Sequence, residues 1–188
     1  MTCRAELLQL LRCSSSNAER TRIRPLLEQL EREQGVDLAQ QQAQLEGVWE
    51  LRWSSSALPY LMVAPWLENL QVLAPQQGRA MNLLRLRGPL SPLGGVAVVA
   101  AISLEGPQRV AVRFQQGGWI GAGPVAGRRA WLRQVRQSFP AWLDITVLDE
   151  ELRVCRGNAG TLFALLRRSD LKANDLLPST PLEQPPAG

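Results

Sequence analysis

From Gly47 onward the chain alternates apolar and polar residues with a period of two, the period of a β-strand with one buried face. In the first run Trp49, Leu51 and Trp53 share one face. Comparable runs follow at residues 70–73, 81–87, 96–104, 110–114, 143–148, 152–156 and 162–166. Turn residues separate the runs: Gly78, Gly88-Pro89, Gly94-Gly95, Gly106-Pro107, Gly117-Gly118, Asp149-Glu150 and Gly157-Asn158. We therefore expect a mostly β (α+β) fold, an antiparallel barrel of about eight strands that can hold one small ligand.

The segments that flank residues 47–168 have other patterns. Residues 1–46 show helical spacing of leucines and an S-x-x-E capping box at residues 16–19, and Pro25 marks either a kink or a helix start. We expect these residues to form an N-terminal helical segment packed on the barrel. Residues 169–188 include four prolines near their end, so we expect a disordered tail.

The 188 residues contain no histidine, which excludes Ser-His-Asp and Cys-His nucleophiles and histidine-bearing zinc or haem sites. The only lysine is Lys172, so a Schiff-base or P-loop lysine is nearly excluded. The three cysteines lack C-x-x-C spacing, which favours a reducing compartment and argues against a disulfide framework or a thiolate metal site. We expect no metal, no cofactor and no catalytic residue.

The net charge of +4 is unevenly distributed, because residues 47–168 carry 14 arginines and seven acidic residues. Such a basic body favours an anionic membrane surface or an acidic partner, although the same excess is common on inert surfaces. The arginines are scattered and the aromatic residues fall in strand patterns, so we expect no nucleic acid partner. No run approaches the ~18 apolar residues of a membrane-spanning helix, and no signal segment is evident.

Residues 127–139 interrupt the period of two. Trp131, Leu132 and Val135 fall on one side of a helical projection, and three arginines fall on the other side, namely Arg129, Arg133 and Arg136. We expect a short amphipathic helix that is a lid over the barrel, a membrane contact made by Trp131 with these arginines, or a plain connector.

Two motifs indicate a known family. Gly47-x-Trp49, with Arg153 and Arg156 in a late strand, has the form of the barrel-closing device of lipocalin-like proteins, in which a guanidinium lies on the indole face. Residues 143–163 have the pattern LDxTxLDExLRxxRGxxGxLF. This run closely resembles the C-terminal signature of the plastid lipid-associated proteins, the fibrillins of chloroplasts and cyanobacteria. The resemblance covers most of residues 17–168, and we identify the chain as similar to a cyanobacterial-type member.

The resemblance implies a lipocalin-like barrel that binds or stores apolar lipids at photosynthetic membranes or lipid bodies. Prenylquinones, tocopherols, carotenoids and fatty acids are the implied ligand classes. The predicted inner wall consists of Trp49, Leu51, Trp53, Val110, Val112, Phe114, Leu152, Val154 and Arg156. The same apolar residues would equally fill a solid core, and the resemblance favours the pocket.

The acidic residues of the signature have a structural interpretation. We expect Asp144 to pair with Arg153 or Arg156, Asp149 to stabilise a turn, and Gly157 to belong to the same structural motif. Alternatively, the Arg156 side chain points into the barrel and binds a carboxylate or quinone oxygen of a ligand.

The prediction is therefore a non-enzymatic lipid-binding protein, cytoplasmic and at most peripheral to the thylakoid membrane. One alternative is a scaffold with a filled barrel that docks a lipid-biosynthetic enzyme. The other is a lipocalin-shaped enzyme that modifies a tetrapyrrole or a lipid.

Overall fold

The computed structural model describes residues 2–13, 17–56, 58, 61, 63–122, 128–137 and 140–178. The helices are α1 (Cys3–Cys13), α2 (Asn17–Glu33), α3 (Leu38–Leu45) and α4 (Ala173–Leu176), and short 3-10 turns lie at Pro75–Gln77 and Gly88–Leu93. The strands are β1 (Gly47–Ser54), β2 (Leu67–Ala74), β3 (Arg79–Leu86), β4 (Gly95–Glu105), β5 (Arg109–Ala122), β6 (Arg128–Gln134), β7 (Ala141–Leu148), β8 (Leu152–Gly157) and β9 (Leu162–Arg167).

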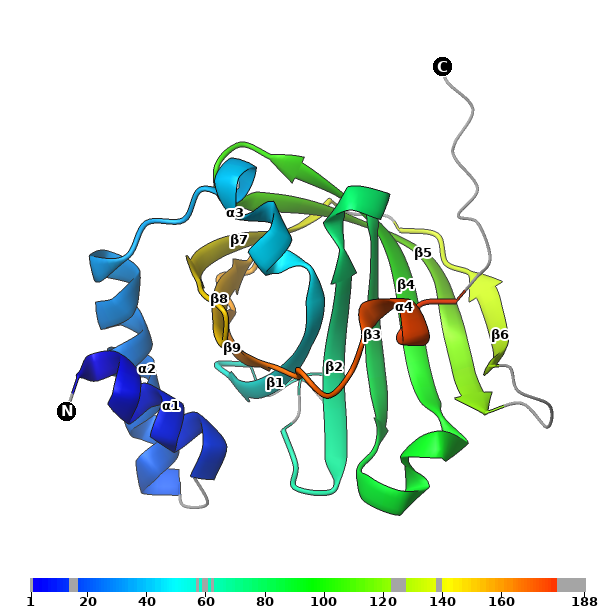
Figure 1. Ribbon diagram of the computed structural model, residues 1–188, viewed down its shortest axis with the longest axis horizontal. Coiled ribbons are helices and arrows are strands. Elements are labelled where there is room, and N and C mark those ends of the chain that lie inside the picture. The colour runs from blue at the N-terminus through cyan, green and yellow to red at the C-terminus, as the bar shows by residue number, and fades with distance from the viewer. Residues whose placement is uncertain are drawn as a thin grey trace.

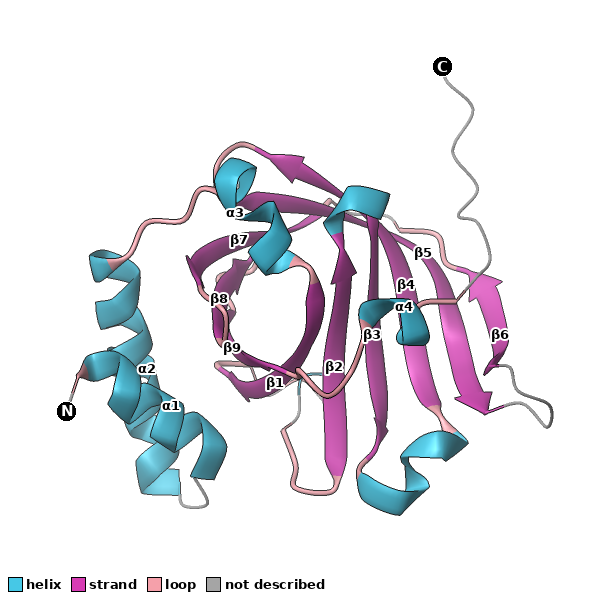
Figure 2. Ribbon diagram, viewed as in Figure 1, coloured by secondary structure: helices cyan, strands magenta, loops and turns pink. Residues whose placement is uncertain are grey.

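The strands form one antiparallel sheet in the order β4-β3-β2-β1-β9-β8-β7-β5, and the pairing of β4 with β5 closes it. This closed barrel of eight strands confirms the predicted fold class. Each of the eight predicted runs falls on one of its strands, and the run 81–87 extends one residue past the end of β3. Strand β6 pairs with the far half of β5 outside the closed ring, so the sheet continues past the barrel on that side (Figures 1 and 2).

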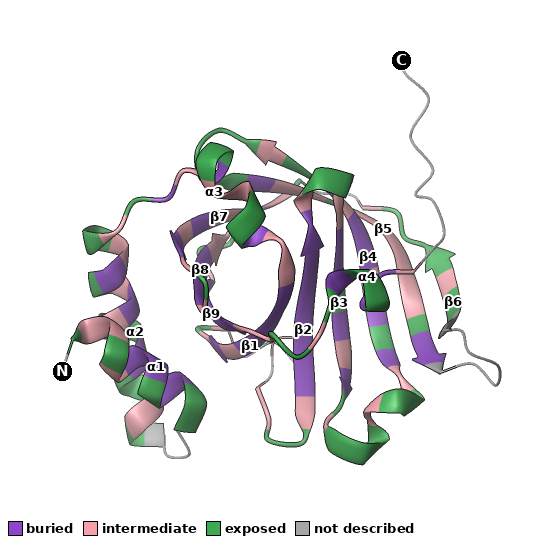
Figure 3. Ribbon diagram, in the orientation of Figure 1, coloured by how far each residue is buried: buried purple, intermediate pink, exposed green. Residues whose placement is uncertain are grey.

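Helices α1 and α2 pack on the outer face of β7, β8 and β9 (Figure 1). Leu7, Ile23 and Leu27 are fully buried there against Val147, Leu152 and other strand residues. Helix α2 runs through Pro25, so it does not begin at that residue. Because the helices cover one face and the barrel interior the other, β8 and β9 are buried almost continuously (Figure 3).

Helix α4 packs on the outer face of β2, β3 and β4, with Ala173, Leu176 and Leu177 buried in the same cluster as Leu70 and Val72. The predicted disordered tail was therefore wrong for residues 173–177, because their apolar side chains have a sheet face to cover. Residues 179–188 of that tail lie outside the described residues.

The predicted helix over residues 127–139 is wrong for residues 128–134, which form β6. The partner strand explains the difference, because β5 continues through Gly117 and Gly118, predicted as a turn, and offers its free edge. A Cβ at Gly118 would lie 2.1 Å from the backbone oxygen of Trp131, so the glycine permits the close approach of β6. Residues 127, 138 and 139 lie outside the described part of the chain.

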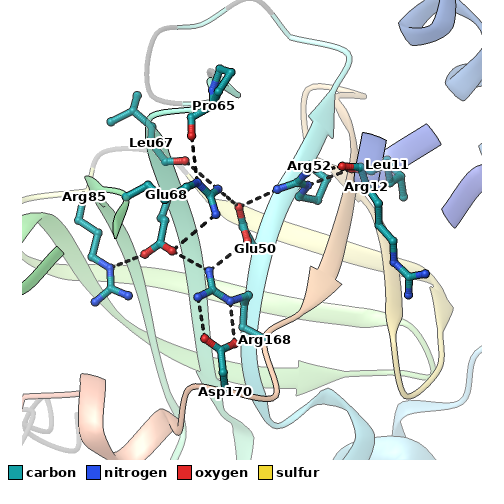
Figure 4. A network of polar contacts seen from close by, with 11 residues as sticks. Leu11, Arg12, Glu50, Arg52, Pro65, Leu67, Glu68, Arg85, Arg168 and Asp170 are labelled. Atoms are coloured by element: carbon teal, nitrogen blue, oxygen red, sulfur yellow. Dashed lines mark hydrogen bonds and ion pairs between the residues drawn. The ribbon is translucent and has the colours of Figure 1, made fainter. Parts of the chain in front are cut away.

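A polar network joins β1, β2, β3 and the segment after β9 (Figure 4). Glu68 accepts hydrogen bonds from Arg85 at 2.7 Å and from Arg168 at 2.8 Å, and Glu50 accepts one from Arg168 at 3.1 Å. Arg87 also donates to Glu50. Both carboxylates are buried on the outer face of the barrel, and each has more than one guanidinium partner, which offsets the cost of desolvation.

Candidate functional site

One end of the barrel is closed by Trp49 and Arg167. The Arg167 guanidinium lies 4.2 Å from the ring centre of Trp49, donates to the Glu46 carbonyl at 2.7 Å, and donates also to the carbonyls of Glu150 and Gln44. The Trp49 indole donates to the Leu45 carbonyl at 3.0 Å, which fixes the end of α3 over this end of the barrel. The predicted closing device is therefore present, but its arginine comes from β9.

Arg153 and Arg156, the two arginines expected to close the barrel, lie elsewhere. Arg153 is fully buried, 5.2 Å from the ring of Trp49, and points into the barrel with Cys155, two residues further along β8. Arg156 faces α2, where its Nε donates to Glu31 at 2.9 Å, and this hydrogen bond raises its pKa. The prediction that Arg156 meets a ligand inside the barrel is wrong.

The barrel interior, or lumen, is one buried cluster of side chains from all eight barrel strands and from α3. Its members are Val36, Leu38, Leu45, Trp49, Leu51, Leu73, Ala80, Ile102, Val110, Ile145, Leu148, Cys155, Phe163 and Leu165, with Leu61, Val63, Leu104, Val112 and Leu143 packed against them. Of the predicted wall, the structure brings together here Trp49, Leu51, Val110 and Val112.

Leu152, Val154 and Trp53 were predicted inside the barrel and lie outside it, buried against α1 and α2. Leu152 and Val154 were assigned to the wrong face because β8 is apolar on both faces, which removes the alternation signal. Trp53 is turned outward by a bulge, since β1 advances from Leu51 to Trp53 while β9 advances by one residue.

A groove of about 870 Å³ lies beside the lumen, between β4, β5, β7 and the residues that follow β6. Phe114, which was predicted in the wall, is half-buried and lines it, and Ile102 and Val112 line both the groove and the lumen. Gln137 holds the segment after β6 against β5, because its side chain accepts a hydrogen bond from the Phe114 amide at 2.6 Å and donates one to the Val112 carbonyl at 3.2 Å. Its lining residues Ser103, Ala111 and Arg113 alternate along β4 and β5 with lumen residues, so the groove lies mainly on the outer face of these strands.

The carboxylates of the C-terminal signature make structural hydrogen bonds. Asp144 accepts two hydrogen bonds from Arg109, at 2.7 and 2.9 Å, which lowers its pKa. Its predicted partner, Arg153 or Arg156, was wrong. Arg109 on β5 and Arg156 on β8 both stand opposite Asp144, but Arg156 pairs with Glu31 of α2, and Arg153 points into the barrel. Asp149 accepts from the amides of two turn residues at 2.8 Å, as predicted, and pairs with Arg4 at 2.9 Å.

Gly157, which the prediction placed in the same structural motif, begins the turn between β8 and β9. Its amide donates to the Thr161 carbonyl at 2.9 Å, and a Cβ here would lie 3.3 Å from Phe163. Phe163 belongs to the lumen, so this glycine leaves room for a lumen ring at the strand end.

An exposed apolar row runs across β3, β4, β5 and β6. Residues Leu84, Val96, Trp119 and Trp131 stand opposite one another on β3, β4, β5 and β6 and therefore share one face. Val96 is 54% exposed, Trp119 is 42% exposed and Trp131 is 62% exposed. Arg133, two residues after Trp131, lies on the same face, and Arg136 is also exposed. The side chain of Arg129 lies outside the described part of the structure.

No group of three His, Cys, Asp or Glu side chains among the described residues is arranged to hold a metal ion. No described helix is both long enough and apolar enough to cross a membrane.

Comparison with known proteins gives one match. Residues 11–166 match the family model PAP_fibrillin, and the match spans all the barrel strands except the last residue of β9. No curated protein sequence and no solved structure matches the chain.

Proposed function

The chain belongs to the PAP_fibrillin family, and from this membership we propose that it binds a small lipid in its barrel without catalysing a reaction. The observation that carries the proposal is the lumen, because its apolar side chains come from all eight barrel strands and from α3. Each Å² of apolar lipid surface removed from water contributes roughly 25 cal/mol. Prenylquinones, tocopherols, carotenoids and fatty acids are the ligand classes we propose.

Lipid extraction tests this proposal. Protein purified from cells that make these lipids is extracted with organic solvent, and the extract is analysed by mass spectrometry. We expect lipid in stoichiometric amount. We expect Val112→Asp, which places a carboxylate against the lumen cluster, to reduce the amount of lipid severalfold. Ala130→Asp, at an exposed position of β6, is the control and is expected to retain the lipid. An extract no richer in lipid than that of the Val112→Asp variant would contradict the proposal.

We further propose that the apolar row docks the protein on an anionic lipid surface, such as a photosynthetic membrane or lipid body. Charge complementarity supports this occupant, because Arg133 lies beside Trp131 and residues 47–168 carry twice as many arginines as acidic residues. Exposed tryptophan next to arginine suits the boundary between headgroups and acyl chains. A contact of this kind is expected to weaken as the salt concentration rises.

Vesicle co-sedimentation tests the docking. We expect binding to phosphatidylglycerol vesicles, little binding to phosphatidylcholine vesicles, and a roughly tenfold weaker association for Trp131→Ala. Trp66→Ala is the matched control, because Trp66 is 58% exposed but lies outside the row. An equal loss for both variants would show that the row is not the contact.

A further inference from the structure

Arg153 is a buried cation with unpaired donors. Its side chain is fully buried in the lumen, its Nη2 donates to the side-chain oxygen of Gln71, and its guanidinium lies 5.2 Å from the ring of Trp49. Its Nε and Nη1 atoms are buried and have no hydrogen-bond partner. Buried guanidinium N–H groups are costly when unpaired, because they lose their hydrogen bonds to water without replacement.

The described lumen residues supply no negative charge to balance Arg153. The buried carboxylates Glu50 and Glu68 belong to the network on the outer face and are paired there with other arginines (Figure 4). Burial raises the pKa of the neighbouring Cys155 thiol to about 11, so this group is neutral at physiological pH. Arg167, which also lies against Trp49, adds a second cation at this end.

We propose that the lumen binds a lipid with an acidic headgroup, a long-chain carboxylate, whose oxygens accept hydrogen bonds from the unpaired N–H groups of Arg153. This inference rests on the proposed function and specifies the ligand class within it. A carboxylate supplies both the missing charge and the missing acceptors, whereas a carotenoid supplies neither and a quinone supplies only neutral acceptors.

The lumen offers the acyl chain an apolar path. The lumen cluster is continuous from Trp49, beside Arg153, to Ile102 and Val112, which line the groove. A bound acyl chain would separate these side chains and lie among them, with its headgroup at the closed end of the barrel. The polar group then lies beside Arg153, and the apolar tail points away from the closed end of the barrel.

The test compares two ligands that differ in the headgroup alone. Delipidated protein is titrated with dodecanoic acid and with dodecan-1-ol at pH 8, and binding is followed by calorimetry. We expect the wild-type protein to bind dodecanoate at least about tenfold more tightly than the alcohol, as a charge-assisted hydrogen bond in a buried site implies. Arg153→Met is expected to lose this preference and still bind the alcohol. Arg156→Met, on the opposite face of the same strand, is the matched control and should keep the preference.

The outcomes separate this inference from the proposed function. Equal affinity for acid and alcohol in the wild-type protein would overturn the headgroup assignment and leave lipid binding intact. Binding of neither would overturn lipid binding itself. Displacement of dodecanoate by equimolar acetate would show a site for a small anion only, and would also overturn the inference.

A second measurement needs no variant, and it decides the question if Arg153→Met does not fold. With dodecanoic acid labelled with ¹³C at the carboxyl carbon, the chemical shift of the bound headgroup is followed as a function of pH. We expect the pKa of the bound carboxyl to lie below that of the free acid, because Arg153 stabilises the ionised form. A bound carboxyl whose pKa is equal to or above that of the free acid would overturn the assignment.

Discussion

Gly47 and Arg167 depend on each other at the closed end of the barrel. Gly47 has φ +135°, a region that L side chains rarely adopt, and a Cβ added to it would lie 2.5 Å from Nη1 of Arg167. That nitrogen donates to the Glu46 carbonyl at 2.7 Å. The glycine is therefore needed both for the backbone turn into β1 and for the space that the closing guanidinium occupies.

Gly47→Ala is expected to destabilise the protein by about 1–3 kcal/mol, because the new methyl group strains the backbone and displaces Arg167 from its carbonyl partners. Chemical denaturation monitored by tryptophan fluorescence measures the change. Gly35→Ala is the control, since nothing lies within 4 Å of a Cβ there and its φ is not positive. Its effect should stay within about 0.5 kcal/mol. Equal losses for the two variants would contradict this explanation.

At the scale of single elements, β8 carries side chains with opposite roles on its two faces. Arg153 and Cys155 point into the lumen, whereas Arg156 points toward α2 and pairs with Glu31. Glu31 is the more buried partner, with 10% of its side chain exposed against 40% for Arg156. The pair thus fastens α2 to the barrel, and its loss would leave a largely buried carboxylate without its cation.

Arg156→Ala is expected to lower the free energy of unfolding by about 1 kcal/mol, a value that allows for the partial exposure of the arginine. Arg136→Ala, at an exposed position after β6, should change it by less than about 0.5 kcal/mol. Combining Arg156→Ala with Glu31→Gln in a double-mutant cycle isolates the pair. Equal melting temperatures for the two single variants would refute the assigned role of Arg156.

Sequence periodicity predicted the elements better than their faces. Apolar runs bounded by turn residues predicted the eight barrel strands, but the run in β8 did not show which face points inward, because helices cover its outer side. The outward position of Trp53 depends on a bulge, and β6 depends on a free edge of β5. These features come from contacts between distant segments, which local periodicity does not encode. For the same reason, the closing role of Arg167 and the unpaired state of Arg153 required the structure.

At the scale of the whole molecule, the polar network on the outer face joins β1, β2 and β3 to the segment after β9. Glu68 on β2 receives Arg85 from β3 and Arg168 from the segment after β9, and Arg168 also binds Glu50 on β1 and Asp170 (Figure 4). Burial acts to raise the pKa of Glu68, but the hydrogen bonds from Arg168 and Arg85 outweigh it, so its pKa lies below the ordinary 4.5. The carboxylate form therefore stabilises the folded state.

The network predicts how stability depends on pH. Because the pKa of Glu68 is lower in the folded than in the unfolded state, its contribution is fully present above pH 4.5 and is lost as the pH falls through the lowered value. Glu68→Gln is expected to cost about 3 kcal/mol at pH 7, since it leaves Arg85 without its buried partner. It should also flatten the loss of stability between pH 5 and pH 2, roughly the range in which such carboxyl groups titrate.

Thermal unfolding across this pH range measures both effects. Asp170→Asn is the matched control, because its side chain is 61% exposed and receives a guanidinium that keeps its other partners. It should cost less than about 1 kcal/mol at pH 7. If Glu68→Gln loses stability on acidification as steeply as the wild-type protein, then Glu68 does not carry the acid sensitivity. The network would then join these strands through its geometry rather than through its charge.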